Sequence, residues 1–161
     1  MPPDIGVIVV AAGRGTRLGG TPKQFRELAG VPVLLRAVRP FASHPSVVCT
    51  VVALPAEDAE APPGWLLPLL GDRLRLVAGG RERGDSVRAA LAALPAACTV
   101  VLVHDAARPL VSAETIEAVM GLARRGAGAV AKPAARRQGR VERWPSNPGV
   151  AMRVRRARDF R

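Results

Sequence analysis

Residues Ile5–Phe25, with the sequence IGVIVVAAGRGTRLGGTPKQF, decide the fold of this chain. The apolar run Ile5–Val10 predicts a buried first strand of a parallel sheet. The next ten residues contain four glycines, and a backbone without side chains lets N–H groups approach an anion closely. Three cations, Arg14, Arg17 and Lys23, lie in the same loop. The sequence therefore predicts a polyphosphate site directly after the first strand.

Two other phosphate-binding loops fit this segment poorly. The dinucleotide fingerprint needs a helix directly after G-x-G-x-x-G, whereas Gly13-Arg14-Gly15 is followed by further glycines and Pro22. The nucleoside-triphosphatase string G-x-x-x-x-G-K-[ST] does not occur in the sequence. An ordinary glycine-rich turn is the alternative without a ligand. The segment resembles the signature loop of sugar-phosphate nucleotidyltransferases, A-G-x-G-x-R followed by P-K.

Composition indicates a single domain with an aliphatic core. The chain has 161 residues, of which 48% are hydrophobic and 3% aromatic, so Val, Leu and Ala must fill the core. No apolar run approaches the ~18–20 residues of a membrane span, and no signal peptide is recognised before the first strand. Cys49 and Cys98 lie in apolar runs and are expected to be free thiols. We expect no membrane partner and a cytoplasmic location.

The basic residues concentrate at the end of the sequence. The net charge is +11, but residues 1–131 carry 14 Lys and Arg against 11 Asp and Glu, whereas residues 132–161 carry 10 against 2. This division predicts an α/β domain over 1–131 and a basic tail over 132–161 without helix or strand period. A tail that binds polyanions and a solvated extension are two interpretations. A third is out-of-frame translation of GC-rich DNA, because Arg occurs 22 times and Lys twice.

Apolar and helical segments alternate along residues 1–131, which predicts a three-layer α/β fold with a mostly parallel sheet. The expected strands are Ile5–Val10, Val47–Ala53, Leu74–Val77, Thr99–Val103 and the beginning of a fifth at Ala127–Ala131. The expected helices are Val33–Phe41, ended or kinked at Pro40, then Ser86–Leu94 and a helix from Ser112 to about Arg125. Residues 55–71 are expected to form a poorly ordered or short helical connection.

A second informative string, VVLVHDAARP at Val100–Pro109, places Asp105 at the carboxyl end of a predicted strand. Open α/β sheets bind ligands at this edge, and a carboxylate there is well placed to hold Mg²⁺ against phosphate oxygens. The alternative to a metal ligand is that Asp105 caps the following loop. For His104, a plain packed or hydrogen-bonded histidine has the same weight as a role in the site.

The third string is AGGRERGDSV, Ala78–Val87, and it again joins a strand to a helix. Gly79 and Gly80 permit close backbone approach, and Ser86 is predicted to cap the helix. A base-binding role and a plain turn with a capped helix are equal alternatives for this string.

Taken together, the three strings resemble the 2-C-methyl-D-erythritol 4-phosphate cytidylyltransferases. The family patterns A-A-G-x-G-x-R…P-K-Q-[FY], G-G-x-x-R-x-D-S-V and H-D-A-A-R-P occur in order over residues 5–130. The resemblance implies a Rossmann-like nucleotide-diphospho-sugar transferase fold. It also implies transfer of CMP from CTP to 2-C-methyl-D-erythritol 4-phosphate, with release of pyrophosphate, in non-mevalonate isoprenoid synthesis. Ribitol 5-phosphate cytidylyltransferases and other sugar-phosphate nucleotidyltransferases are the nearest alternatives.

The same resemblance implies roles for individual residues in binding CTP. The backbone that wraps the triphosphate belongs to Ala11, Ala12, Gly13, Arg14 and Gly15. Gly80 and Ser86 lie against the cytosine and ribose, and Ala106 lies near the sugar.

For catalysis, the resemblance implies that Arg17 and Lys23 neutralise charge on the α-phosphate and the leaving pyrophosphate. Asp105 binds Mg²⁺, and Arg108 helps to hold the methylerythritol phosphate.

The resemblance ends near Ala131. The family's Pro-Val-x-Asp-Thr, Thr-Pro-Gln and Thr-Asp-Glu strings, its late lysine and its homodimer-forming β-arm find no match in residues 132–161. We therefore expect weak binding of CTP·Mg²⁺, poor turnover and no arm-exchanged homodimer. An inactive CTP-binding fragment or a basic-tailed polyanion binder is the alternative of another class, although binding of nucleic acid is not favoured.

Overall fold

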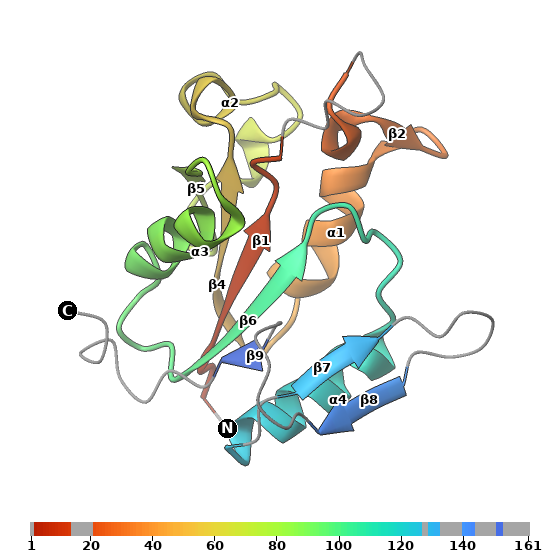
Figure 1. Cartoon of the computed structure of the whole chain (residues 1–161), viewed down its shortest axis with the longest axis vertical. Helices are drawn as coiled ribbons and strands as arrows, with labels where there is room; N and C mark the ends of the chain where they lie inside the picture. Colours follow the sequence, from red (N-terminus) through yellow and green to blue (C-terminus); the bar gives the residue numbers. More distant parts are fainter. Residues whose placement is uncertain (1, 14–20, 127–128, 133–139, 144–150, 153–161) are drawn as a thin grey trace.

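A five-stranded sheet forms the centre of the computed structural model, which describes residues 2–13, 21–126, 129–132, 140–143 and 151–152 (Figure 1). The strand order is β5-β4-β1-β6-β9. Four strands are parallel: β1 (Ile5–Val10), β4 (Val47–Leu54), β5 (Leu74–Ala78) and β6 (Val100–Asp105). The short β9 (Ala151–Met152) pairs antiparallel with β6. The predicted mostly parallel sheet is confirmed.

The central strand β1 is buried on both faces because its residues alternate between two apolar cores. Ile5, Val7 and Val9 belong to one core, and Ile8 belongs to the other. All four side chains are fully buried, as expected for a parallel strand with helices on both sides. The continuous apolar run at the start of the sequence therefore has a direct structural cause.

Helices cover both faces of the sheet and produce the predicted three layers (Figure 1). On one face, α1 (Val33–Ala42) and α4 (Ala113–Arg124) pack through residues such as Leu34 and Met120. On the other face, α3 (Arg83–Ala92) packs through Ala90. Residues 55–71 contain the short helix α2 (Ala56–Glu60) and the 3₁₀ turn η3 (Leu67–Leu69), so a short helical connection was predicted correctly.

Two helix boundaries differ from the prediction. Helix α1 does not end at Pro40 but continues to Ala42. Helix α3 begins at Arg83, so the prediction that Ser86 caps it is wrong. Its N-cap is Glu82, whose backbone N–H donates to the Asp85 carboxylate at 3.1 Å. That contact satisfies one of the donors at the start of the helix and leaves Ser86 inside the first turns.

The predicted start of α4 is confirmed. Ser112 is the N-cap, and its hydroxyl accepts from the backbone N–H of Thr115 at 3.2 Å. Gly126, directly after the helix, has a φ of 83°, a left-handed conformation that glycine adopts without a steric penalty.

Two small antiparallel hairpins complete the described secondary structure. The first joins β2 (Glu27–Leu28) to β3 (Val31–Pro32), and the 3₁₀ turn η2 (Lys23–Phe25) precedes it. The second joins β7 (Ala129–Lys132) to β8 (Arg140–Arg143).

The end of the described chain departs from two expectations. A strand does form near the predicted Ala127–Ala131, but β7 pairs with β8 and not with the central sheet. Residues 132–161 contain β8 and β9, so the expectation of a segment without strands is wrong there. The division of the chain at residue 131 stays a prediction.

Candidate active site

All three informative strings meet at the carboxyl edge of the sheet. Val10, the last residue of β1, is in register with Asp105 on β6 and Ala53 on β4. The backbone continues this pairing beyond the strands, because Ala106 N–H donates to Val10 O at 3.0 Å and Ala11 N–H donates to Ala53 O at 2.9 Å. Asp105 therefore lies beside the start of the glycine-rich loop.

The loop after β5 packs directly against the loop after β1. Gly79 donates its N–H to Leu54 O at 2.7 Å. A Cβ atom at Gly79 would lie 2.3 Å from the Cβ of Ala12 and 2.7 Å from the hydroxyl of Ser86, so no other residue fits without movement. A Cβ at Gly80 would lie 2.2 Å from the Cβ of Asp85. Both glycines therefore pack closely against neighbouring residues, and close approach of their backbone to a ligand stays a prediction.

Ser86 supports this junction from within α3. Its side chain is 1% exposed, and its hydroxyl accepts from Gly80 N–H at 3.2 Å and donates to Glu82 O at 3.4 Å. The hydroxyl therefore orients Gly80 at the edge of the site. Ala11 and Ala106 are also buried, at 4% and 2% exposure. Contacts of these three residues with a nucleotide stay predictions.

Asp105 is the acidic group at the centre of the edge. Its Oδ1 lies 3.0 Å from Nη2 of Arg83, and its Oδ2 lies 3.3 Å from Nε of Arg108. Arg83 is the first residue of α3, and Arg108 lies in the turn after β6. The carboxylate is one-third exposed, so it is oriented by two guanidinium groups and still open to a ligand. The sequence analysis gave Arg83 no role, although it is one of the two arginines of the third string and the one that the family pattern G-G-x-x-R-x-D-S-V contains.

His104 supports the turn that carries Asp105. Its Nε2 donates to the carbonyl oxygen of Arg108 at 3.0 Å, and its ring packs 5.0 Å from that of Phe41, centroid to centroid. Burial lowers the pKa of His104 and favours the neutral ring, whereas the hydrogen bond to Arg108 acts in the opposite direction with a smaller effect. The structure supports the packed, hydrogen-bonded alternative for this residue.

Within the turn η2, Lys23 is exposed, whereas the next residue, Gln24, is buried against the start of the glycine-rich loop. Gln24 is the second residue to which sequence reasoning gave no role. Arg14, Gly15 and Arg17 lie outside the described residues, so their predicted contacts with phosphate stay predictions.

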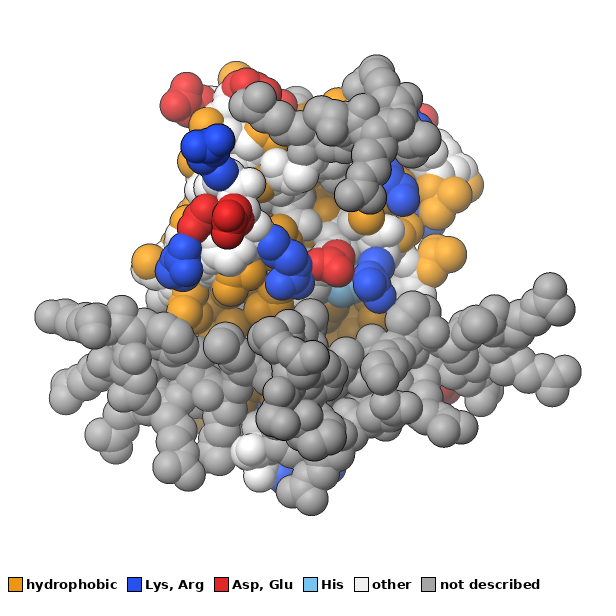
Figure 2. Space-filling model, in the orientation of Figure 1, with side chains coloured by type: hydrophobic (Ala, Val, Ile, Leu, Met, Phe, Trp, Pro, Cys, Tyr) orange, Lys and Arg blue, Asp and Glu red, His pale blue; other side chains and the backbone are white. Residues whose placement is uncertain are grey.

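The donor set suits a magnesium ion that is shared with a nucleotide. Mg²⁺ is usually held by one or two carboxylates together with phosphate oxygens and water. Asp105 supplies such a carboxylate, and no group of three or more potential protein ligands occurs among the residues that the structure describes. Figure 2 shows acidic and basic side chains interspersed on the face toward the viewer.

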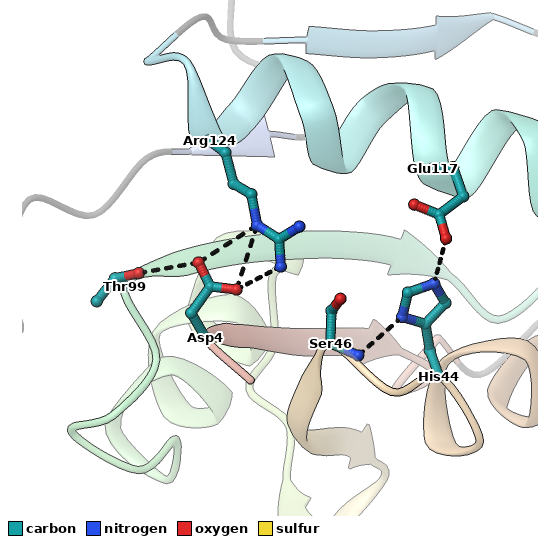
Figure 3. Close-up of polar contacts among 6 residues, drawn as sticks. All are labelled: Asp4, His44, Ser46, Thr99, Glu117 and Arg124. Atoms are coloured by element: carbon teal, nitrogen blue, oxygen red, sulfur yellow. Dashed lines mark hydrogen bonds and ion pairs between the residues drawn. The ribbon is translucent and has the colours of Figure 1, made fainter. Parts of the chain in front are cut away.

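A separate set of charged contacts connects α4 to the segments before β1 and β4, at the opposite edge of the sheet (Figure 3). The guanidinium of Arg124, at the end of α4, donates to both carboxylate oxygens of Asp4, which precedes β1. Earlier in α4, Glu117 accepts from His44 Nε2 at 2.9 Å. The hydrogen bond with Asp4 raises the pKa of Arg124. These groups support the fold and lie at the edge away from Asp105.

A parallel sheet with a glycine-rich loop after its central strand, and a carboxylate at the end of the neighbouring strand, defines a nucleotide-binding α/β protein of the nucleotidyltransferase class. The family model described as 2-C-methyl-D-erythritol 4-phosphate cytidylyltransferase matches residues 5–141. The chain belongs to this family, and the match extends into the segment 132–161.

Curated relatives support the assignment to the family. The cytidylyltransferase of Streptomyces coelicolor is 46% identical over 128 residues, which are 76% of this chain and 47% of that protein. The enzyme of Frankia casuarinae is 48% identical over 118 residues, covering 73% of this chain and 43% of that protein. The chain thus spans about half the length of the curated relatives it matches.

Solved structures show the same fold. The cytidylyltransferase of Thermus thermophilus superposes with a TM-score of 0.61 at 29% identity, covering 82% of this chain and 56% of that one. A synthase from Anaerococcus prevotii superposes with a TM-score of 0.66 at 21% identity, covering 91% of this chain and 66% of that one. Within the described residues, no helix is both long and apolar enough to cross a membrane.

Proposed function

We propose that this chain binds CTP at the carboxyl edge of its sheet and transfers CMP to 2-C-methyl-D-erythritol 4-phosphate, releasing pyrophosphate. The observation that carries the proposal is the pairing of Asp105 with Val10, which brings the carboxylate beside the glycine-rich loop. Membership of the family, and the names of the relatives above, support the choice of cytidine and methylerythritol phosphate. The reaction belongs to non-mevalonate isoprenoid synthesis and is proposed to occur in the cytoplasm.

In this reaction an oxygen of the substrate phosphate attacks the α-phosphorus of CTP. A new phosphorus–oxygen bond forms while the bond from the α-phosphorus to the bridging oxygen breaks, and pyrophosphate leaves with the bonding electrons. The step needs no covalent enzyme intermediate, so the protein contributes positioning and charge stabilisation. Gly80 and Ser86 border the position proposed for the nucleoside, and Ala106 would lie near the sugar.

The cationic residues would neutralise the charge that develops during transfer. Lys23 and Arg17 would face the triphosphate, and Arg108 would bind the phosphate of methylerythritol phosphate. Asp105 would hold Mg²⁺, which when bound supplies positive charge to the phosphate oxygens. Arg83 and Arg108 keep the carboxylate of Asp105 oriented through their ion pairs.

Two titrations and one turnover assay test the proposal. Isothermal titration calorimetry measures CTP binding with and without Mg²⁺, and coupled pyrophosphate release measures turnover with methylerythritol phosphate or ribitol 5-phosphate. Lys23→Ala should reduce turnover more than CTP affinity, because its charge matters most as negative charge accumulates in the transition state. Asp105→Asn should weaken both Mg²⁺-dependent binding and turnover. An Asp105→Asn protein with unchanged Mg²⁺ dependence would refute the metal assignment.

Three other results of these experiments would each indicate a different function. CTP binding without turnover would identify a binding domain, and preference for ribitol 5-phosphate would identify the related enzyme. Salt-sensitive binding of unrelated DNA, lost on deletion of residues 132–161, would identify a polyanion binder. A sizing column run alongside reports whether the chain forms the homodimer expected of the family.

A further inference from the structure

Gln24 is a buried polar side chain that touches the glycine-rich loop at two points. It is 5% exposed, although Lys23 before it and Arg26 after it lie at the surface. Its Nε2 atom donates to Ala11 O at 2.9 Å and to Gly13 O at 3.2 Å. A side-chain amide nitrogen carries two hydrogens, so each of its donors has one carbonyl partner.

These two hydrogen bonds fix the orientation of the peptide groups at the beginning of the loop. Peptide groups are planar and the described chain contains no cis bond, so a carbonyl and the next N–H point in opposite directions. With the Ala11 carbonyl turned toward Gln24, the N–H of Ala12 points away from it. Among the described residues, no acceptor takes the N–H of Ala12 or Gly13. Within the part of the chain that the structure describes, both donors are therefore available to an anion.

Gln24 also fixes the position of Lys23 relative to the loop. The two residues share the turn η2, where Phe25 N–H donates to Pro22 O at 2.9 Å and Arg26 N–H donates to Lys23 O at 3.3 Å. The side chain of Gln24 thus connects this turn to the residues directly after β1. Because this turn and the start of the loop are already held together in the free protein, less conformational entropy is lost there when a ligand binds.

We infer that Gln24 is a positioning residue: it orients the backbone of Ala11–Gly13, at the start of the glycine-rich loop, toward the phosphates and fixes the position of Lys23 beside it. This role rests on the proposed function, because it assigns the loop to the triphosphate of CTP. Gln24 acts through the backbone of Ala11 and Gly13, and the inference assigns it no contact with the reacting atoms.

The test compares ligands that share different parts of CTP, using the full 161-residue chain. Gln24→Met keeps the length of the side chain and removes both donors. Calorimetry then measures binding of CTP, inorganic tripolyphosphate and cytidine in the presence of Mg²⁺. We expect affinity for CTP and for tripolyphosphate to fall about tenfold or more, with cytidine affinity unchanged. An equal loss for all three ligands would show a general structural role and would overturn the inference.

Two further variants keep the test decisive. Gln24→Asn keeps a polar amide but is one methylene too short to reach both carbonyl oxygens, so it should also lose affinity for CTP and tripolyphosphate with cytidine affinity unchanged, even if Gln24→Met does not fold. An equal loss for all three ligands in this variant would likewise overturn the inference. Thr50→Val changes another buried polar side chain, within β4, and should leave all three affinities unchanged.

The ligands also separate this inference from the proposed function. Wild-type binding of tripolyphosphate without binding of CTP would refute the choice of nucleotide, while the loss of tripolyphosphate binding in Gln24→Met would still support the positioning role. Wild-type affinity for both phosphates in Gln24→Met would refute the positioning role alone.

Discussion

Replacing Gly79 with alanine should disturb the junction between the loops after β5 and β1. The new Cβ would lie 2.3 Å from the Cβ of Ala12, 2.7 Å from Oγ of Ser86 and 3.3 Å from the carbonyl oxygen of Leu54. Carbon atoms in contact normally lie ~3.5–4.0 Å apart, so the first contact is more than an ångström too short. The Cβ of Ala12 is fixed to the backbone and cannot rotate away. One of the two loops must therefore move, which changes the junction at Ala12.

The magnitude follows from the cost of overpacking, which is about 1–3 kcal/mol for an added methyl group in a close-packed site. For a chain of this size each kcal/mol corresponds to roughly 2–4 °C in Tm, so Gly79→Ala should melt about 2–12 °C lower in differential scanning calorimetry. Because the changed junction includes Ala12, calorimetric titration should also show weaker binding of CTP.

Gly84→Ala is the matched control. Gly84 lies in the first turn of α3, the helix that follows the loop containing Gly79, and a Cβ there would meet nothing within 4 Å. Alanine is favoured over glycine within a helix by roughly 0.5–1 kcal/mol, so this variant should melt slightly higher and bind CTP as the wild type does. If Gly79→Ala kept the wild-type Tm and CTP affinity, the close packing of the two loops would be refuted.

Three further predictions concern the core, the far edge and a thiol. Thr50→Val should raise the free energy of unfolding by about 1 kcal/mol in urea titrations, because the buried Thr50 hydroxyl has no partner among the described residues; a loss of stability would show that it has one. Arg124→Met should lower that free energy by about 1–3 kcal/mol, and strict additivity with Asp4→Asn in a double-mutant cycle would contradict the contact between them. Burial raises the pKa of Cys98 to about 11, so its thiol stays protonated at pH 8 and should react slowly with Ellman's reagent until the pH approaches 11; rapid reaction at pH 8 would contradict this.

Local sequence patterns predicted the parts of the fold that depend on neighbours in the chain. The apolar run Ile5–Val10 and the cap at Ser112 are examples, and both elements formed as expected. The position of Asp105 was also predictable, since parallel strands end at a common edge of the sheet.

Contacts between distant segments explain what was missed. Serine is a common N-cap residue, but Glu82 and Asp85 cap the N-terminus of α3. The hydroxyl of Ser86 accepts from the N–H of Gly80 instead. The bond from Arg83 to Asp105 and those from Gln24 to Ala11 depend on how loops pack, which no spacing in the sequence encodes.

The pairing of strand β7 was also not predictable from the local sequence. The residues near Ala131 have the composition of a strand, and a strand was predicted there. Composition does not determine the pairing partner, and β7 pairs with β8 while β6 pairs with β9.

The placement of β1 between β4 and β6 has a consequence for how the protein is made. Asp4, just before β1, bonds to Thr99 and Arg124, which follow it by 95 and 120 residues. At roughly 5–20 residues per second, a ribosome synthesises 95 residues in about 5–20 s, and until then one edge of β1 lacks its partner strand. An apolar strand with an open edge is prone to aggregate during that interval. The pairing that brings Asp105 beside Val10 cannot precede the synthesis of β6, so a nascent chain gains its complete carboxyl edge only after residue 105 has been added.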